Sequence, residues 1–277
     1  MELRCRDSNV SLDRTVILGV LNVTPDSFSD GGLWFDTSAA VKHGLEMQRQ
    51  GAAIIDVGGE STRPGADAVD EAEELRRVLP VIESLAAEGV GPISIDTRKP
   101  AVAEAALEAG AAIINDTTGE ETDPAMGRIA ATTGAGFIVM HSRGSPATMR
   151  SLTVYSDVVG DVRDFLVARA EQLQNGGVAR ESIVIDPGIG FAKDAGQSVL
   201  LTTRVKDFVD TGYPVLLGTS RKSFIGKTLD LGESDRVEAT VATAVWGVTQ
   251  GVRLLRVHDV EPHVRAIRMV EAILSAG

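Results

Sequence analysis

Short, almost wholly apolar runs alternate with longer stretches rich in Ala, Glu and Leu along most of the 277 residues. Strands buried on both faces of a parallel sheet have this continuous apolar character. The runs that fit are 16–21, 53–57, 93–95, 112–114, 136–140, 182–185, 214–217 and 252–257. Eight strand–helix pairs over about 250 residues are typical of an α/β fold closed into a single (β/α)₈ TIM barrel. The alternative is a doubly wound open sheet.

Residues between these runs mark where helices begin and end. Asp70 followed by Glu73 has the form of a capping box at a helix start. Gly134 stands where another helix should stop. Because no linker or shift of composition divides the chain, we predict one barrel domain over residues 15–277, preceded by an N-terminal extension, 1–14. His43 and His263 are expected at the surface and Trp246 in the core.

The charge balance excludes several classes of function. Lys and Arg number 27 against 39 Asp and Glu, which gives a net charge of −12, and aromatic residues make up only 4%. Such a chain lacks the basic footprint and the stacking platforms of a nucleic-acid binder. No apolar run approaches the roughly 20 residues of a membrane span, and the polar N-terminus lacks a signal-peptide core. We therefore expect a cytoplasmic protein without nucleic-acid or membrane partners.

Polar or ionisable residues follow every one of the eight runs. In a barrel these positions meet at one mouth, where active sites lie. A single residue of this kind is often a helix cap or a turn residue. Polar side chains at all eight strand ends are costly to bury unless they bind a ligand or one another. The main candidates are Asn22, Asp56, Asp96, Asn115, His141, Asp186, Lys222, Arg256 and His258.

Two sets of these residues suggest what the ligand is. Carboxylates and amides can read the edge of a flat heterocycle that carries N–H groups. Cationic side chains suit a phosphate or pyrophosphate, and a neutral amide oxygen suits a Mg²⁺ ion that arrives with phosphates. The first set is Asp96, Asn115 and Asp186; the second is Lys222, Arg256 and His258, with Asn22 as the amide. The residues predict an enzyme that binds a polar ring and an anionic leaving group.

Several familiar chemistries have no motif here. A phosphate-binding P-loop, an H-E-x-x-H zinc motif, a G-x-S-x-G elbow and a complete dinucleotide fingerprint are all missing from the sequence. The single cysteine, Cys5, can form neither an internal disulfide nor a thiolate cage. We expect His141 to be structural, bonding within the strand-end network.

Two long motifs resemble the signatures of the dihydropteroate synthases. Residues 18–32 read LGVLNVTPDSFSDGG and residues 56–65 read DVGGESTRPG. Shorter matches follow in the same order at 94–97, 114–116, 186–191, 220–222 and 256–259, so the resemblance spans about 16 to 272. It implies a (β/α)₈ barrel, usually a homodimer, of folate synthesis. Such an enzyme joins 6-hydroxymethyl-7,8-dihydropterin pyrophosphate to p-aminobenzoate and releases pyrophosphate and 7,8-dihydropteroate.

The resemblance also implies roles for single residues. The pterin edge would be bound by Asp96, Asn115, Asp186 and Lys222, with Met140, Phe191 and Gly218 beside the ring. The pyrophosphate would be held by Arg256, His258 and Asn22, with Mg²⁺ at Asn22. The p-aminobenzoate side would comprise Thr62, Arg63, Pro64, Ser220 and Lys222, and the first loop would add Phe28 and Asp30. The predicted catalytic residues are Lys222, Asp96, Asp186, Arg256 and Asp30.

The implied mechanism is dissociative: pyrophosphate leaves first and the arylamine then attacks the pterin cation. The family is inhibited by sulfonamides that mimic p-aminobenzoate. Thr117 and Thr118, and Ser142 and Arg143, depart from the commonest family residues but lie beside the matched positions.

Two alternative functions remain. One is a pterin-binding methyltransferase acting with a corrinoid protein, and the other is a degenerate paralogue that binds without catalysis.

Overall fold

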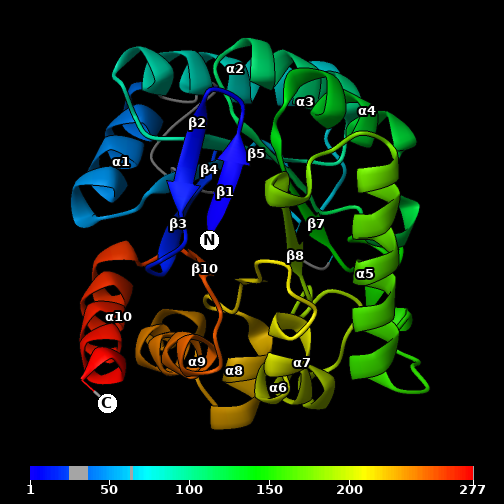
Figure 1. Cartoon of the computed structure of the whole chain (residues 1–277), viewed down its shortest axis with the longest axis vertical. Coiled ribbons are helices and arrows are strands. Elements are labelled where there is room, and N and C mark those ends of the chain that lie inside the picture. Colours follow the sequence, from blue (N-terminus) through cyan, green and yellow to red (C-terminus); the bar gives the residue numbers. More distant parts are fainter. Residues whose placement is uncertain (25–36, 63–64, 277) are drawn as a thin grey trace.

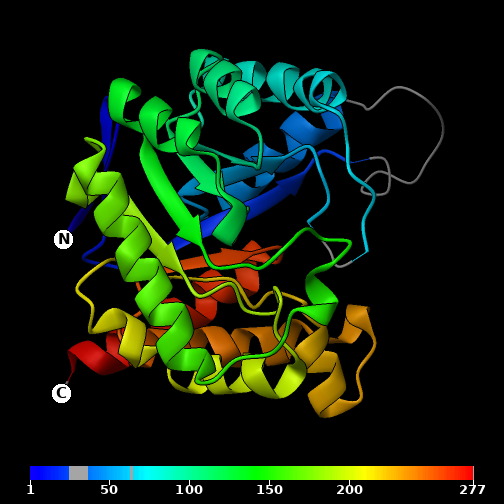
Figure 2. The ribbon, with the colours of Figure 1, turned by 90° about the vertical axis from the view of Figure 1, so that its right-hand side faces the viewer.

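The computed structural model describes residues 1–24, 37–62 and 65–276, and its centre is a closed barrel of parallel strands (Figures 1 and 2). The strands are β3 (Val16–Asn22), β4 (Ile54–Gly58), β5 (Ile93–Thr97), β6 (Ile113–Asp116), β7 (Gly136–Met140), β8 (Ile183–Asp186), β9 (Leu216–Leu217) and β10 (Leu254–Val257). They pair in the order β8-β7-β6-β5-β4-β3-β10-β9. A parallel bridge between Ile185 and Val215 joins the two ends. The barrel prediction is confirmed, and each strand lies within two residues of its predicted run.

Helices surround the barrel on its outer side (Figure 1). They are α1 (Thr37–Gln50), α2 (Glu71–Ala87), α3 (Pro100–Glu108), α4 (Pro124–Thr133), α5 (Val158–Asn175), α6 (Ala195–Thr203), α7 (Lys206–Val209), α8 (Ser223–Leu229), α9 (Val237–Thr249) and α10 (Val260–Ser275). Short 3₁₀ helices occur at Gly119–Glu121, Met149–Ser151, Arg180–Ser182 and Glu233–Asp235. Within the described residues, none of these helices combines the length and the hydropathy that a membrane crossing requires.

The helix starts follow the cap residues only in part. The Asp70 side chain accepts a hydrogen bond from the backbone N–H of Glu73 at 2.8 Å, as a capping residue should. The Glu73 carboxylate, however, binds Arg76 and Arg77 instead of returning to Asp70. The predicted capping box is therefore only half formed, because two arginines on the same helix compete for the glutamate.

A short N-terminal hairpin closes the amino end of the barrel. Its strands β1 (Glu2–Cys5) and β2 (Ser8–Ser11) are antiparallel and lie across that end in Figure 1. Leu3 and Leu12 pack into one apolar cluster with inward side chains of the barrel strands, including Leu18. The sequence predicted this segment only as an extension. Its physical role is to bury the lower layer of the barrel interior, which would otherwise face water.

Arg6, at the turn of this hairpin, ties it to the helical layer. The guanidinium donates to the backbone oxygens of Leu107 at 2.5 Å and Ala111 at 3.0 Å. The backbone N–H of Arg6 donates to the oxygen of Gly134 at 2.7 Å. The hairpin is thus fixed by polar contacts at its tip and by apolar packing along its inner face.

Two side chains lie opposite to their predicted places. His263 is fully buried, and its Nδ1 lies 2.6 Å from the backbone oxygen of Asp259. Trp246 is 42% exposed, with its indole N–H bonded to the backbone oxygen of Thr202 at 3.0 Å. His43 is exposed, as predicted. Which face of a helix is covered depends on its neighbours, and residue type alone did not reveal this for α9 and α10.

We predict that Leu3→Ala lowers the free energy of unfolding by about 2–5 kcal/mol, because it opens a cavity under the barrel interior. Urea unfolding measures the change. The control is Leu229→Ala, a leucine that is 54% exposed on α8, for which about 0.5 kcal/mol or less is expected. Equal effects of the two substitutions would contradict the plugging role of the hairpin.

Candidate active site

One pocket opens at the carboxyl ends of the strands, and side chains of several strands meet in it. Its lining residues are Asn115, Thr117, Met140, Asp186, Phe191, Gly218, Ser220, Lys222, Arg256 and His258. All of them except Thr117 were predicted as site residues. The geometry thus brings together acidic, amide, cationic and apolar groups that are far apart in the sequence. The free volume that remains between them is only about 30 Å³.

Arg256, on β10, fills the centre of the mouth. Its Nε lies 2.6 Å from Asp56 Oδ2, and its terminal nitrogen lies 2.6 Å from Asp96 Oδ2. The Asn115 amide donates to Asp56 Oδ2 at 3.2 Å. One guanidinium on β10 therefore bridges β4 and β5, from which β10 is separated by β3. Sequence reasoning placed Asp56 at a strand end but missed that it anchors this arginine.

Burial and the neighbouring charges shift the pKa values of Asp96 and Arg256. It raises the pKa of Asp96 to about 7, against the pull of the Arg256 guanidinium, and the neighbouring Asp56 carboxylate adds to the rise. Burial by itself lowers the pKa of Arg256, but Asp56 and Asp96 together raise it above its ordinary value. A single cation between two buried carboxylates leaves one negative charge in excess. The cluster is therefore poised to take up a proton or a hydrogen-bond donor.

Thr117 was predicted to lie beside the site and in fact lines it. Its hydroxyl donates to Asp96 Oδ1 at 3.2 Å. Both oxygens of Asp96 therefore have a partner, Thr117 on one side and Arg256 on the other. The sequence offered no signal for this contact beyond the position of Thr117 two residues after Asn115.

Lys222 and Asp186 face each other near Gly218, where a Cβ atom would lie 3.9 Å from both Asp186 Oδ2 and Lys222 Nζ. The Lys222 ammonium donates to the backbone oxygen of Ile189 at 2.5 Å and lies 4.5 Å above the centre of the Phe191 ring. Burial lowers the pKa of Lys222 to about 8, although Asp186 opposes the shift. Burial likewise raises the pKa of Asp186. Lys222 thus loses its proton more readily than an exposed lysine.

A loop between β8 and α6 supplies the floor beneath Lys222. The Asp186 carboxylate accepts from the backbone N–H of Gly188 at 2.7 Å. Lys193, which sequence reasoning missed, donates to the oxygen of Phe191 at 2.8 Å and contacts His141 Nδ1 at 3.0 Å. Burial lowers the pKa of His141 to about 2, so the imidazole is neutral. His141 therefore bonds within the strand-end network, as predicted, and lies outside the pocket lining.

The remaining predicted residues are less well placed by the structure. Asn22 ends β3, and its side chain forms no hydrogen bond with the described part of the chain. Thr62 is half-buried and is not among the described lining residues. Four predicted residues lie outside the described residues: Phe28, Asp30, Arg63 and Pro64.

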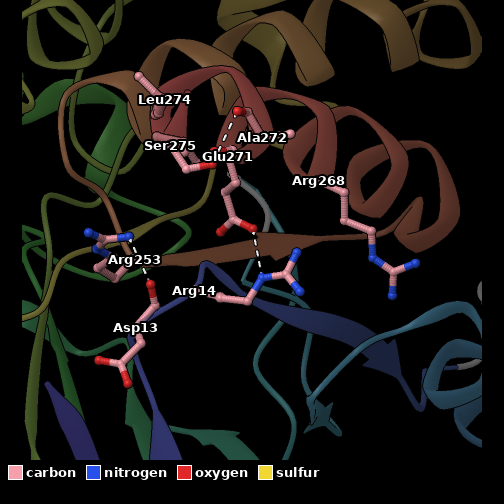
Figure 3. A pocket seen from close by; sticks show the side chains of 9 residues that line it. Asp13, Arg14, Arg253, Arg268, Glu271, Ala272, Leu274 and Ser275 are labelled. Atoms are coloured by element: carbon pink, nitrogen blue, oxygen red, sulfur yellow. Dashed lines mark hydrogen bonds and ion pairs between the residues drawn. The ribbon is translucent and has the colours of Figure 1, made fainter. Parts of the chain in front are cut away.

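A larger hollow, of about 440 Å³, lies away from this mouth, near the C-terminal helix (Figure 3). Several of its charged side chains already have partners in the protein. Arg14 pairs with Glu271 at 3.1 Å, and Arg253 lies 3.5 Å from the backbone oxygen of Asp13. Because these contacts satisfy much of the local charge, this hollow offers no convergent set of groups comparable to the strand-end pocket.

Comparison with known proteins agrees with this geometry. A model of the pterin-binding enzymes matches residues 18–258. The chain belongs to the dihydropteroate synthase family of pterin-binding enzymes. Dihydropteroate synthase from Bacillus subtilis is 44% identical over 265 residues, which cover 96% of this chain and 90% of that protein. Members of this family are transferases of folate biosynthesis, and the chain is one of them.

Two solved structures of dihydropteroate synthases superpose closely. The Clostridium difficile enzyme, determined in the presence of pteroic acid, has a TM-score of 0.89 and 46% identity, covering 94% of this chain and 97% of that chain. The Yersinia pestis enzyme, in complex with a sulfonamide drug, has a TM-score of 0.93 and 40% identity, covering 99% and 100%. The barrel is thus that of a dihydropteroate synthase.

We predict that Arg256→Met lowers the free energy of unfolding by about 3–5 kcal/mol at pH 8, because Asp56 and Asp96 lose their shared cation. Arg256 holds the pKa of Asp96 down against burial, so without Arg256 the pKa of Asp96 moves further up. A folded-state pKa raised above the unfolded value favours folding at low pH, and this advantage is lost as the pH rises through the folded value. The defect should therefore be smaller at pH 5 than at pH 8.

Urea unfolding at the two pH values measures this difference. The control is Arg163→Met, which removes an arginine paired with Asp164 on the exposed side of α5. Its effect should be small and independent of pH. A loss of stability in Arg256→Met that is the same at pH 5 and pH 8 would contradict the buried-cluster explanation.

Proposed function

We propose that the protein condenses 6-hydroxymethyl-7,8-dihydropterin pyrophosphate with p-aminobenzoate to form 7,8-dihydropteroate and pyrophosphate. The observation that carries this proposal is the convergence, in one pocket, of an acidic and amide set with a cationic set. Asn115 and Asp186 line the pocket, and Asp96 is bonded to the lining residue Arg256. Together they suit the donor-rich edge of a pterin. Lys222, Arg256 and His258 lie on neighbouring strand ends and suit an anionic leaving group.

The proposed reaction is dissociative. The bond between the pterin methylene carbon and the pyrophosphate oxygen breaks, and its electron pair leaves with the pyrophosphate. The amine nitrogen of p-aminobenzoate then attacks the methylene carbon and loses a proton. Arg256 and His258 stabilise the charge that grows on the leaving group, while Asp96 and Asp186 stabilise the cation on the ring. Lys222, between Asp186 and Ser220, contacts both substrates.

We propose that Mg²⁺ enters this site with the pyrophosphate. Among the described residues no group of three or more His, Cys, Asp or Glu could hold a metal ion alone. The Asn22 side chain at the end of β3 has no partner among the described residues, and its amide oxygen suits an ion whose other ligands are phosphate oxygens and water. When bound, the ion would neutralise charge on the leaving pyrophosphate.

The p-aminobenzoate side is proposed to comprise Ser220 and Lys222 together with the segment 62–64. A sulfonamide that mimics p-aminobenzoate would compete for this side. We also propose that Phe28 and Asp30 act from the first loop, with Asp30 among the catalytic residues, and that the protein works in the cytoplasm.

Product formation from the two substrates tests the proposed function directly. We predict that Lys222→Ala lowers turnover at least ~10²-fold, the scale of one preorganised electrostatic contact. Lys227→Ala, which removes an exposed lysine from α8, the helix that follows Lys222, should leave turnover unchanged. Binding without product would support the degenerate paralogue, and methyl transfer from a methylated pterin to a corrinoid protein would support the other alternative. Near-normal turnover in Lys222→Ala would remove this residue from its central role.

We further propose a homodimer through α9 and α10, which lie side by side (Figure 1). Apolar side chains are exposed on this pair, among them Met269 and Ile273 on α10 and Trp246 on α9. We predict that light scattering finds twice the mass of one chain and that Ile273→Glu reduces it to one. Val154→Glu, at a valine 84% exposed elsewhere, should remain dimeric. A wild-type protein with the mass of one chain would overturn the proposal.

A further inference from the structure

We propose that Arg221 and Asp259 form a positioning clamp that aligns the two loops carrying Ser220, Lys222 and His258. This inference rests on the proposed function and adds two residues that it does not use. Neither side chain is among the described residues that line the pocket. Each is, however, the direct chain neighbour of residues that do line it.

The backbone of Arg221 is held in an unusual conformation. Its φ is +55°, in the left-handed region that non-glycine residues rarely adopt. The N–H of Arg221 donates to Thr240 Oγ1 at 3.1 Å, and its carbonyl oxygen accepts from Arg236 at 3.0 Å. Both partners come from α9 and the residue just before it. The surrounding structure thus fixes a strained turn between the two pocket residues Ser220 and Lys222.

The side chain of Arg221 reaches the other loop. Its Nε and terminal nitrogen lie 2.9 Å and 2.5 Å from the two carboxylate oxygens of Asp259. Beside this pair, the backbone N–H of His258 donates to Ser220 Oγ at 3.1 Å, and His258 Nδ1 lies 3.0 Å from the same oxygen. The loop after β9 and the end of β10 are therefore joined twice, once inside the pocket and once behind it.

The position of Asp259 supports a positioning role. Asp259 is the N-cap residue of α10, yet its side chain makes no capping hydrogen bond. An aspartate at this place ordinarily accepts from the first helical N–H groups. Here the carboxylate is directed to Arg221 instead. Since a partly exposed ion pair contributes little to overall stability, the two-point geometry acts mainly on orientation.

The orientation of the two loops matters because Lys222 and His258 are proposed to contact different parts of the reacting substrates. Lys222 lies beside the pterin and p-aminobenzoate, whereas His258 holds the pyrophosphate. A shift of about 1 Å between groups of this kind costs on the order of 10²-fold in rate. Asp96 and Asn115, which read the pterin edge, stand on β5 and β6 and do not depend on the clamp.

The test is Asp259→Asn, which keeps the shape of the side chain but removes its charge and its two-point contact. We expect kcat/KM for dihydropteroate formation to fall at least ~10-fold. The affinity for inorganic pyrophosphate, measured by calorimetry, should also fall. The affinity for a 6-hydroxymethylpterin without pyrophosphate should fall much less than that for pyrophosphate, because Asp96, Asn115 and Asp186 lie outside the clamp and Lys222 alone among its proposed contacts follows it. A merely structural defect would weaken both ligands together.

The matched control is Asp207→Asn, which breaks another two-point pair, between Arg204 and Asp207, on the helical layer. It should change neither affinity. Arg221→Lys, which keeps the charge but loses the fork, is the second variant if Asp259→Asn does not fold, and the same split is expected. Wild-type pyrophosphate affinity and turnover in the folded variant would overturn the clamp. Lack of dihydropteroate formation by the wild-type protein would overturn the proposed function instead, and the pyrophosphate measurement would still decide the clamp.

Discussion

The mouth of this barrel depends on one arginine placed between two buried carboxylates. Arg256 extends from β10 to Asp56 and Asp96 on β4 and β5, so it connects strands that are not adjacent along the chain. Two carboxylates without a cation could not remain ionised at this depth. Their shared partner lets the barrel hold acidic groups where a closed, apolar interior begins. The remaining site residues are arranged around this bridge.

The apolar lower half of the barrel makes that arrangement possible. Inward side chains of β3, β4 and β6 to β10 pack with the hairpin residues Leu3 and Leu12 into one apolar cluster. With that end sealed, the opposite end is free to carry polar groups whose burial costs stability. One end of the barrel thus contributes apolar packing, and the other carries the polar site. The free volume near the mouth is small because Arg256 and Lys222 extend into it.

Lys222 and His258 at the mouth are each oriented by contacts of their own. Lys222 is directed by the oxygen of Ile189 and by the Phe191 ring, while Lys193 fixes the loop that carries both. His258 is directed by Ser220. None of these supports lies in the long family signatures near the N-terminus. They come from the loops after β8 and β9, which are adjacent only after the barrel closes.

The fold and most of the pocket could be predicted from the sequence because both follow from local pattern. Continuous apolar runs at regular spacing require strands buried on both faces, and residues at their carboxyl ends then share one mouth. Asn115, Asp186 and Lys222 were assigned on that ground and do line the pocket. The family motifs added the identity of the substrates. Strand number, strand limits and the composition of the mouth were therefore set by the sequence.

Contacts between distant segments were decided only by the tertiary structure. The bridge from Arg256 to Asp56, the Thr117 hydroxyl on Asp96 and the hairpin beneath the barrel have no periodic signal. The burial of His263 and the exposure of Trp246 depend on which helix face a neighbour covers. A sequence pattern records the environment of each residue along its own element. Which of two available partners a long side chain selects depends on distances across the closed barrel, and these exist only in the folded chain.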